Sequence, residues 1–226
     1  MAYLASIGAG LRTKSVALPA VAILLNITWE YNIFTRCGLL NLPFLPSGLA
    51  FQYCGSGLSG LMAGLIAVTL LLDLVLLLQL VLWGWAGGGA ALGRARLQSL
   101  VVLLLGLCGA AGVHVALMLS FDDYGGVLDA WLINLVMSAL FLDLLRQRQG
   151  GAGLSRLAAW TKLIGSACNA IYVGWGPSLL DQPLGPMLSL FAAVFVLDAL
   201  YAVGLTRAKA GALLRASSWA PPPAGR

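Results

Sequence analysis

Three acidic residues lie inside long apolar runs of this sequence, where a charged side chain is energetically costly. Glu30 lies in the first run, Asp73 in a leucine-rich second run, and Asp198 in the last. Acidic residues at such depth are rare in membrane helices and mark proton or ion pathways. Desolvation favours the uncharged carboxyl, which then remains able to donate a proton near neutral pH. These acids are therefore the first candidates for a site that moves protons.

Other polar residues recur near these acids at helical spacing. Residues three or four apart share one face of a helix, and four such groups stand out: Asn26 with Glu30, Asn134 with Ser138, Ser166 with Asn169 and Tyr172, and Asp198 with Tyr201. We expect Asn26, Asn134, Ser138 and Tyr201 to support the acids. The alternative is that the Asn and Ser side chains only join the helices through hydrogen bonds.

Aromatic residues accompany these polar stripes. Trp29 precedes Glu30, Trp131 lies one turn before Asn134, and Tyr172 ends the third stripe. An aromatic ring attracts a cation through its π face. We expect Trp29, Trp131 and Tyr172 to contact the substrate and to stabilise a transient cation.

Signals for a metal or a cofactor are weak. The single histidine, His114, is expected to be a hydrogen-bonded residue near a helix end, because a metal site needs several ligands. The acids around Asp122 and Asp123 lack the spacing of a magnesium–diphosphate site, and no glycine-rich phosphate loop is present. We expect neither a metal nor a cofactor. Asp129 and Asp143 are expected at solvated helix ends.

The elements that must position these residues are membrane-spanning helices. Of 226 residues, 60% are hydrophobic and 9% are charged, and a spanning helix needs about 20 apolar residues. Backbone groups in lipid must pair within their own segment, so runs of this length predict helices. The sequence predicts an all-α bundle of six spans: Val16–Phe34, Leu58–Trp83, Leu97–Leu119, Val127–Leu145, Leu157–Trp175 and Pro186–Leu205.

The distribution of positive charge predicts the orientation of the bundle. Arg36 is the exception among 13 lysines and arginines, because the other twelve, Lys162 included, fall in or beside alternate connections. This pattern places both termini in the cytoplasm. The cations form no block of the kind that binds nucleic acid. Arginine outnumbers lysine ten to three, which favours a GC-rich bacterial source and hence the bacterial plasma membrane.

Two segments leave the span count open between six and seven. Residues 39–53 are apolar but contain Pro43 and Pro46, which favours a re-entrant segment, and Tyr3–Leu11 is too short to span and is expected at the membrane surface. We expect one membrane domain over residues 1–210 and a disordered cytoplasmic tail over residues 211–226, where three prolines follow one another.

Four motifs of this chain resemble one family in order and spacing over residues 3–207. The family is that of the small integral-membrane terpene cyclases of fungal meroterpenoid and indole-diterpene pathways, together with their bacterial relatives. The matching segments are LPAVAILLNITWEYNIF, LLLDLVLLLQLVLWG, FDDYGGVLDAWLINLVMSALFLDLLRQRQGG and FAAVFVLDALYAVG. Family members commonly carry one more helix before the first motif.

The resemblance implies a metal-independent enzyme that protonates an epoxide or alkene of a prenyl chain. The double bonds then close rings through a cationic cascade. The two acids regarded as essential in the family correspond to Glu30 and Asp198, and Asp73 is left with a supporting role. The implied partners are membrane lipid and a farnesylated aromatic or alkaloid substrate. Two alternatives remain: a small proton-coupled transporter, and a non-catalytic membrane scaffold.

Overall fold

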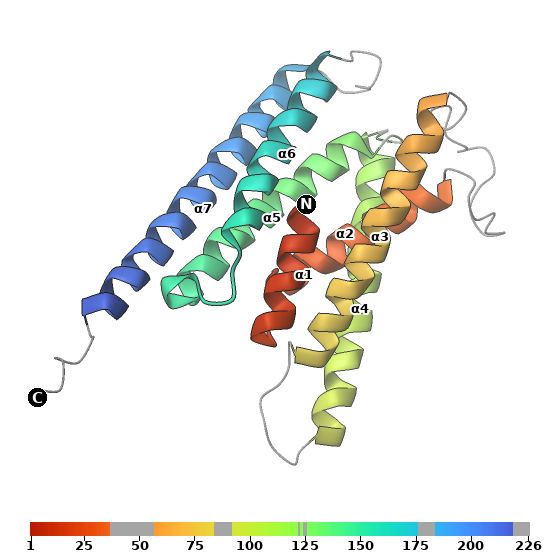
Figure 1. Ribbon diagram of the computed structural model, residues 1–226. Helices are drawn as coiled ribbons and strands as arrows, with labels where there is room; N and C mark the ends of the chain where they lie inside the picture. The colour runs from red at the N-terminus through yellow and green to blue at the C-terminus, as the bar shows by residue number, and fades with distance from the viewer. Residues whose placement is uncertain (37–56, 84–91, 122, 124–125, 176–183, 219–226) are drawn as a thin grey trace, which may run out of the picture.

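The computed structural model describes residues 1–36, 57–83, 92–121, 123, 126–175 and 184–218. Within these ranges the chain forms seven α-helices and one short 3-10 turn, with no strand (Figure 1). The elements are α1 (Ala2–Thr13), α2 (Ala20–Arg36), α3 (Gly57–Trp83), α4 (Leu92–Phe121), α5 (Val127–Gln147), η3 (Gln149–Gly151), α6 (Arg156–Trp175) and α7 (Leu184–Ser218). The all-α prediction is confirmed. The segment 39–53 lies outside the described residues.

Four helices are long and apolar enough to cross a membrane. Their candidate spans are Gly64–Trp83, Gln98–Phe121, Val127–Gln147 and Gly185–Ala212, which fall on four of the six predicted spans. The other two predicted spans fall on α2 and α6. Helix α2 has only 17 residues, and α6 contains polar residues that lower its mean hydropathy. Length and composition therefore support a membrane protein but do not confirm six spans.

The helices pack in two overlapping groups, one around α2 and one around α7. Helices α3 to α7 alternate in direction in Figure 1. Helix α2 packs against α3, α4 and α5, while α7 packs against α5 and α6. One apolar core, with fully buried residues such as Ile23, Leu76 and Leu205, takes side chains from all seven α-helices. A smaller apolar cluster surrounds Trp131, which packs against Phe191 at 4.2 Å between ring centroids.

The first helix lies inside this arrangement. Helix α1 packs between α3 and α6, as Figure 1 shows (red), and it buries Ser6, Ile7, Ala9 and Gly10. The segment Tyr3–Leu11, expected at the membrane surface, is thus packed between two helices of the bundle. Gln79 of α3 helps to fix this helix, because its Nε2 donates to the carbonyl of Ile7 at 3.1 Å.

Two helix boundaries differ from the prediction for identifiable reasons. A left-handed residue, Lys14 (φ 46°), ends α1, and Pro19 directly precedes α2, so α2 starts at Ala20 rather than at Val16. Proline lacks an N–H group and suits the entry to a helix. At the other end α7 continues to Ser218. Residues 211–218 of the predicted tail are thus helical, and residues 219–226 lie outside the description.

Basic residues from three parts of the chain meet at one end of the bundle. Arg148, after α5, donates from Nη2 to the carbonyl of Val16 in the α1–α2 connection. Lys209 of α7 lies close to both Arg12 and Arg156. Four of the cations that the charge pattern assigned to one side of the membrane, Arg12, Arg148, Arg156 and Lys209, therefore lie at one end of the fold.

Candidate functional site

Two of the predicted acids meet in a cluster that we call the acid cluster: Tyr3, Asn26, Glu30 and Asp73. The Tyr3 hydroxyl lies 3.2 Å from Glu30 Oε1 and 3.1 Å from Asp73 Oδ2. Asn26 donates from Nδ2 to the same hydroxyl oxygen. One phenolic oxygen thus connects side chains from α1, α2 and α3.

Both carboxyls of the acid cluster are withdrawn from solvent. Glu30 is 4% exposed and Asp73 is 0% exposed. Glu30 Oε2 and Asp73 Oδ1 have no hydrogen-bond partner among the described residues. A buried carboxylate oxygen without a partner is costly, and two like charges around one hydroxyl repel each other. The arrangement therefore favours a pair in which at least one carboxyl is neutral and holds a proton.

Three members of this cluster were predicted as site residues, and the fourth was not. Asn26 and Glu30 are four residues apart on α2, and α2 packs against α3, which carries Asp73. Tyr3 was not predicted as a site residue. Its only sequence signal is a hydroxyl-bearing ring in a run of small and apolar residues, and that signal does not identify its partners.

Asp198 belongs to a second cluster, the lysine cluster, made of Asn134, Ser138, Lys162, Ser166 and Asp198. Lys162 Nζ lies 2.5 Å from Asp198 Oδ1 and donates to Asn134 Oδ1 and Ser138 Oγ, each at 2.8 Å. Asp198 also accepts from Ser138 Oγ at 2.7 Å and from Ser166 Oγ at 2.8 Å. Both oxygens of Asp198 and all three protons of the Lys162 ammonium thus have partners.

This cluster corrects the interpretation of Lys162. The sequence suggested a cation beside a connection, whereas the side chain is 11% exposed and forms an ion pair inside the bundle. Asp198 is 1% exposed, so this carboxyl is buried together with the ammonium that it faces. Sequence spacing correctly grouped Asn134 with Ser138. It did not identify Lys162, because the residues that meet come from three helices.

A cavity of about 130 Å³ lies between the two clusters. Tyr3 and Asn26 of the acid cluster contribute to its wall, as do Asn134 and Lys162 of the lysine cluster. Phe141 and Tyr201 add aromatic rings whose centroids are 4.9 Å apart. Neither Glu30 nor Asp198 lines the cavity directly. The two acids predicted as a pair therefore lie in separate clusters, each one hydrogen bond behind the cavity wall.

The predicted aromatic residues lie elsewhere. Trp131 is 2% exposed and packs in the apolar cluster with Phe191. Trp29 donates from Nε1 to the carbonyl of Gly126 at 3.1 Å, and Tyr172 is 45% exposed. None of the three lines the cavity. Tyr201, which was predicted as a supporting residue, does line it.

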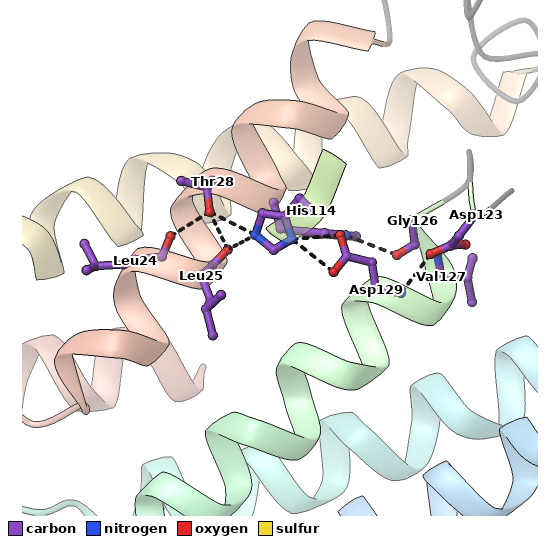
Figure 2. Close-up of polar contacts among 9 residues, drawn as sticks. Leu24, Leu25, Thr28, His114, Asp123, Gly126, Val127 and Asp129 are labelled. Atoms are coloured by element: carbon purple, nitrogen blue, oxygen red, sulfur yellow. Dashed lines mark hydrogen bonds and ion pairs between the residues drawn. The ribbon is translucent and has the colours of Figure 1, made fainter. Parts of the chain in front are cut away.

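A third polar group joins α2, α4 and α5 around His114. Figure 2 shows the imidazole of His114 between α2 and α5. Its Nδ1 lies 2.8 Å from Asp129 Oδ2 of α5, and its Nε2 lies 3.0 Å from the carbonyl oxygen of Leu25 of α2. Nε2 also lies 2.9 Å from Thr28 Oγ1. Asp123 in turn accepts hydrogen bonds from the backbone N–H groups of Val127 and Asp129.

This group agrees with one prediction and corrects another. His114 is hydrogen-bonded as expected, but it is 0% exposed and lies inside the fold. Asp129, expected at a solvated helix end, is 3% exposed. Burial raises the pKa of the Asp123 carboxyl, although the N–H groups at the start of α5 oppose that shift. In the described part of the chain, no group of three or more His, Cys, Asp or Glu side chains could hold a metal ion.

No family model, curated protein or solved structure matches this chain. The resemblance to the membrane terpene cyclases therefore has only the four sequence motifs as its support.

Proposed function

We propose that this chain is a membrane-bound, metal-independent terpene cyclase. It would protonate an alkene or epoxide of a prenyl chain. The substrate that we favour carries a farnesyl chain on an aromatic or alkaloid head group. The observation that carries the proposal is the acid cluster: two buried carboxyls around one hydroxyl that lines a cavity. The four motifs of the sequence add support.

In this proposal the acid cluster supplies the first proton. Glu30 is the general acid, and Asp73 and Asn26 hold the hydrogen-bonded group together. Protonation of an alkene carbon, or of an epoxide oxygen with cleavage of a C–O bond, leaves a carbocation on the chain. Phe141 and Tyr201 offer π faces to that cation at the cavity wall. Each ring then forms when a double bond donates its electron pair, and loss of a proton ends the cascade.

Asp198 takes an orienting role in this scheme. It is the ionised partner of Lys162, so it is a poorer first proton donor than an acid that lacks a cationic neighbour. Through Ser138 and Lys162 it fixes one wall of the cavity. A cavity whose wall is held in place pre-folds the flexible prenyl chain, which is catalysis by proximity.

We also propose that the chain crosses the membrane six times. Helices α2 and α6 would span together with α3, α4, α5 and α7. The bacterial plasma membrane, with both termini in the cytoplasm, fits the basic residues gathered at one end of the bundle.

The test uses membranes that contain the full chain and a farnesylated phenol or farnesylated indole, each with and without a terminal epoxide. Wild-type membranes should form an isomeric cyclic product, and in D2O the alkene substrates should gain one carbon-bound deuterium. Glu30→Gln should lower the rate by about 100-fold or more, because a positioned general acid contributes roughly 10²–10⁴-fold. Asp143→Asn is the matched control, since Asp143 is exposed and outside both clusters.

A wild-type rate in Glu30→Gln would contradict the assignment of the proton donor. If the wild-type protein converts none of these substrates, the cyclase proposal fails as a whole for farnesylated aromatic and alkaloid compounds.

A proton-coupled transporter is the second candidate, and the buried Lys162–Asp198 ion pair favours it. Ionisable pairs inside membrane helices mark ion and proton pathways. Proteoliposomes that take up a solute only under an imposed proton gradient, and that convert no prenylated substrate, would support the transporter over the cyclase.

A further inference from the structure

We propose that the Tyr3 hydroxyl delivers the proton to the substrate, with the Glu30–Asp73 pair as the proton reservoir behind it. This inference rests on the proposed cyclase function and adds a catalytic residue to it. It concerns a helix, α1, to which the motifs assigned no chemical role.

The position of the hydroxyl carries the inference. Tyr3 lines the cavity, whereas the two carboxyls that it contacts do not. Asn26, the other cavity-lining member of the acid cluster, donates to the Tyr3 oxygen, and an amide is not an acid. Within the described residues, Tyr3 is therefore the group through which a proton can pass from the acid pair to the cavity.

The hydrogen-bonding capacity of a phenol suits this transfer. A phenolic oxygen has one proton to donate and two lone pairs that accept. With the Asn26 N–H on one lone pair, the second can accept a proton from Glu30. The single O–H bond, which faces Asp73 Oδ2 at 3.1 Å before the reaction, must turn to the substrate, and its proton then leaves toward the cavity. The proton thus enters the phenol from Glu30 on one side and leaves to the substrate on the other. The phenol is neutral before and after this transfer.

The step balances in atoms and charge. The Tyr3 O–H bond breaks as its proton bonds to an alkene carbon or an epoxide oxygen of the substrate. At the same time the Glu30 carboxyl transfers its proton to the Tyr3 oxygen and becomes a carboxylate. The substrate gains one positive charge and the acid cluster gains one negative charge. No oxidant, metal or further reactant takes part.

The anchoring of α1 gives the relay a fixed geometry. Gln79 holds the carbonyl of Ile7 at 3.1 Å, and Gly10 lies so close to Gln79 and Ser15 that no Cβ fits there. A helix held at its far end by α3 keeps the Tyr3 ring between the acids and the cavity. The transfer thus needs no large movement of the chain.

The principal test compares Tyr3→Phe with Tyr31→Phe in the farnesyl cyclisation assay described above. Both variants lose only a hydroxyl, but Tyr31 is 46% exposed and lies outside both clusters. Tyr3→Phe should lower kcat by about 100-fold, within the range of general acid catalysis, and leave KM within about threefold because the ring remains. Tyr31→Phe should keep the wild-type kcat.

A second measurement separates proton transfer from a structural role. Fluorotyrosines at position 3 preserve the hydroxyl and nearly the whole shape of the ring while making the phenol progressively more acidic. A relay predicts that kcat changes systematically with phenol acidity. An unchanged kcat across the series would overturn the relay even if Tyr3→Phe fails to fold.

The outcomes keep this inference distinct from the proposed function. An active wild type together with an equally active Tyr3→Phe variant overturns the relay and leaves the cyclase standing. A wild type that converts no farnesylated substrate overturns the cyclase, and the relay falls with it. A large loss of kcat in Tyr3→Phe, with Glu30→Gln also inactive and kcat following phenol acidity, supports both.

Discussion

At the scale of single residues, the buried acids differ in what neutralises them. Asp198 faces an ammonium at 2.5 Å, whereas Glu30 and Asp73 share a neutral hydroxyl. Removing one partner of a buried ion pair leaves an uncompensated charge. Replacing a neutral carboxyl by an amide of the same shape leaves no such charge. The two sites should therefore respond differently to the same kind of substitution.

We predict that Asp198→Asn destabilises the protein by roughly 3–5 kcal/mol, because Lys162 is then left buried without a counter-charge. The double variant Asp198→Asn with Lys162→Met should recover much of that loss. Glu30→Gln should stay within about 1 kcal/mol of the wild type if the carboxyl is already neutral. Denaturant unfolding in detergent measures the free energy of unfolding of all three variants. Equal losses of stability in Asp198→Asn and Glu30→Gln would contradict the different charge states of the two sites.

The same comparison assigns a role to Asp198. A loss of activity in Asp198→Asn alone does not separate chemistry from folding, because the single change also isolates Lys162. The double variant removes both charges together. If it folds and forms the cyclic product at a rate near that of the wild type, the Asp198 carboxylate is needed only to neutralise Lys162 and takes no part in the chemistry.

At the scale of helices, α1 depends on a close approach between Gly10 and its neighbours. A Cβ at Gly10 would lie 2.5 Å from Gln79 Oε1 and 2.8 Å from the carbonyl oxygen of Ser15. The Gln79 side chain can move away, but the backbone of Ser15 cannot do so without changing the α1–α2 connection. Helix α1 would shift, and the Tyr3 ring would shift with it.

We therefore predict that Gly10→Ala destabilises the protein by about 1–3 kcal/mol, as overpacked sites do, and lowers cyclisation together with stability. Gly8→Ala is the matched control, because nothing lies within 4 Å of its Cβ position and alanine favours a helix over glycine. Thermal unfolding and product formation should both remain at or above wild type in Gly8→Ala. Equal effects of the two substitutions would mean that α1 is not held at Gly10.

The helices were easier to predict from sequence than their contacts. The bounds of α3 and α5 were predicted within two residues, because a bilayer fixes the length of an apolar run. Spacing along one helix also grouped Asn26 with Glu30. The pairs His114–Asp129 and Lys162–Asp198 join different helices, and no local pattern specifies which helices become neighbours. Asp129 and Lys162 were accordingly assigned to solvated ends and connections.

At the scale of the whole molecule, the number of spans decides which ends of the helices share a side of the membrane. Helix α2 has only 17 residues, and α6 carries polar residues such as Lys162, so neither qualifies as a span by length and composition. Both helices also contribute polar residues to the two clusters. Those polar groups face one another inside the fold rather than lipid. A polar helix can span when its partners satisfy its polar groups, so the six-span arrangement requires a direct test.

We predict the sides of three single cysteines placed in a variant without the natural cysteines. Lys14→Cys and Ala152→Cys should react with a membrane-impermeant thiol reagent from the cytoplasmic side, and Ser120→Cys from the opposite side; all three positions are exposed. The spanning of α2, α3 and α4 separates residue 14 from residue 120, and α5 separates residue 120 from residue 152. Comparing the labelling of intact cells with the labelling of inverted vesicles gives the side of the membrane on which each residue lies. If residues 14 and 120 react from the same side, one of α2, α3 and α4 does not cross, and α2, with its 17 residues, is the first to reconsider.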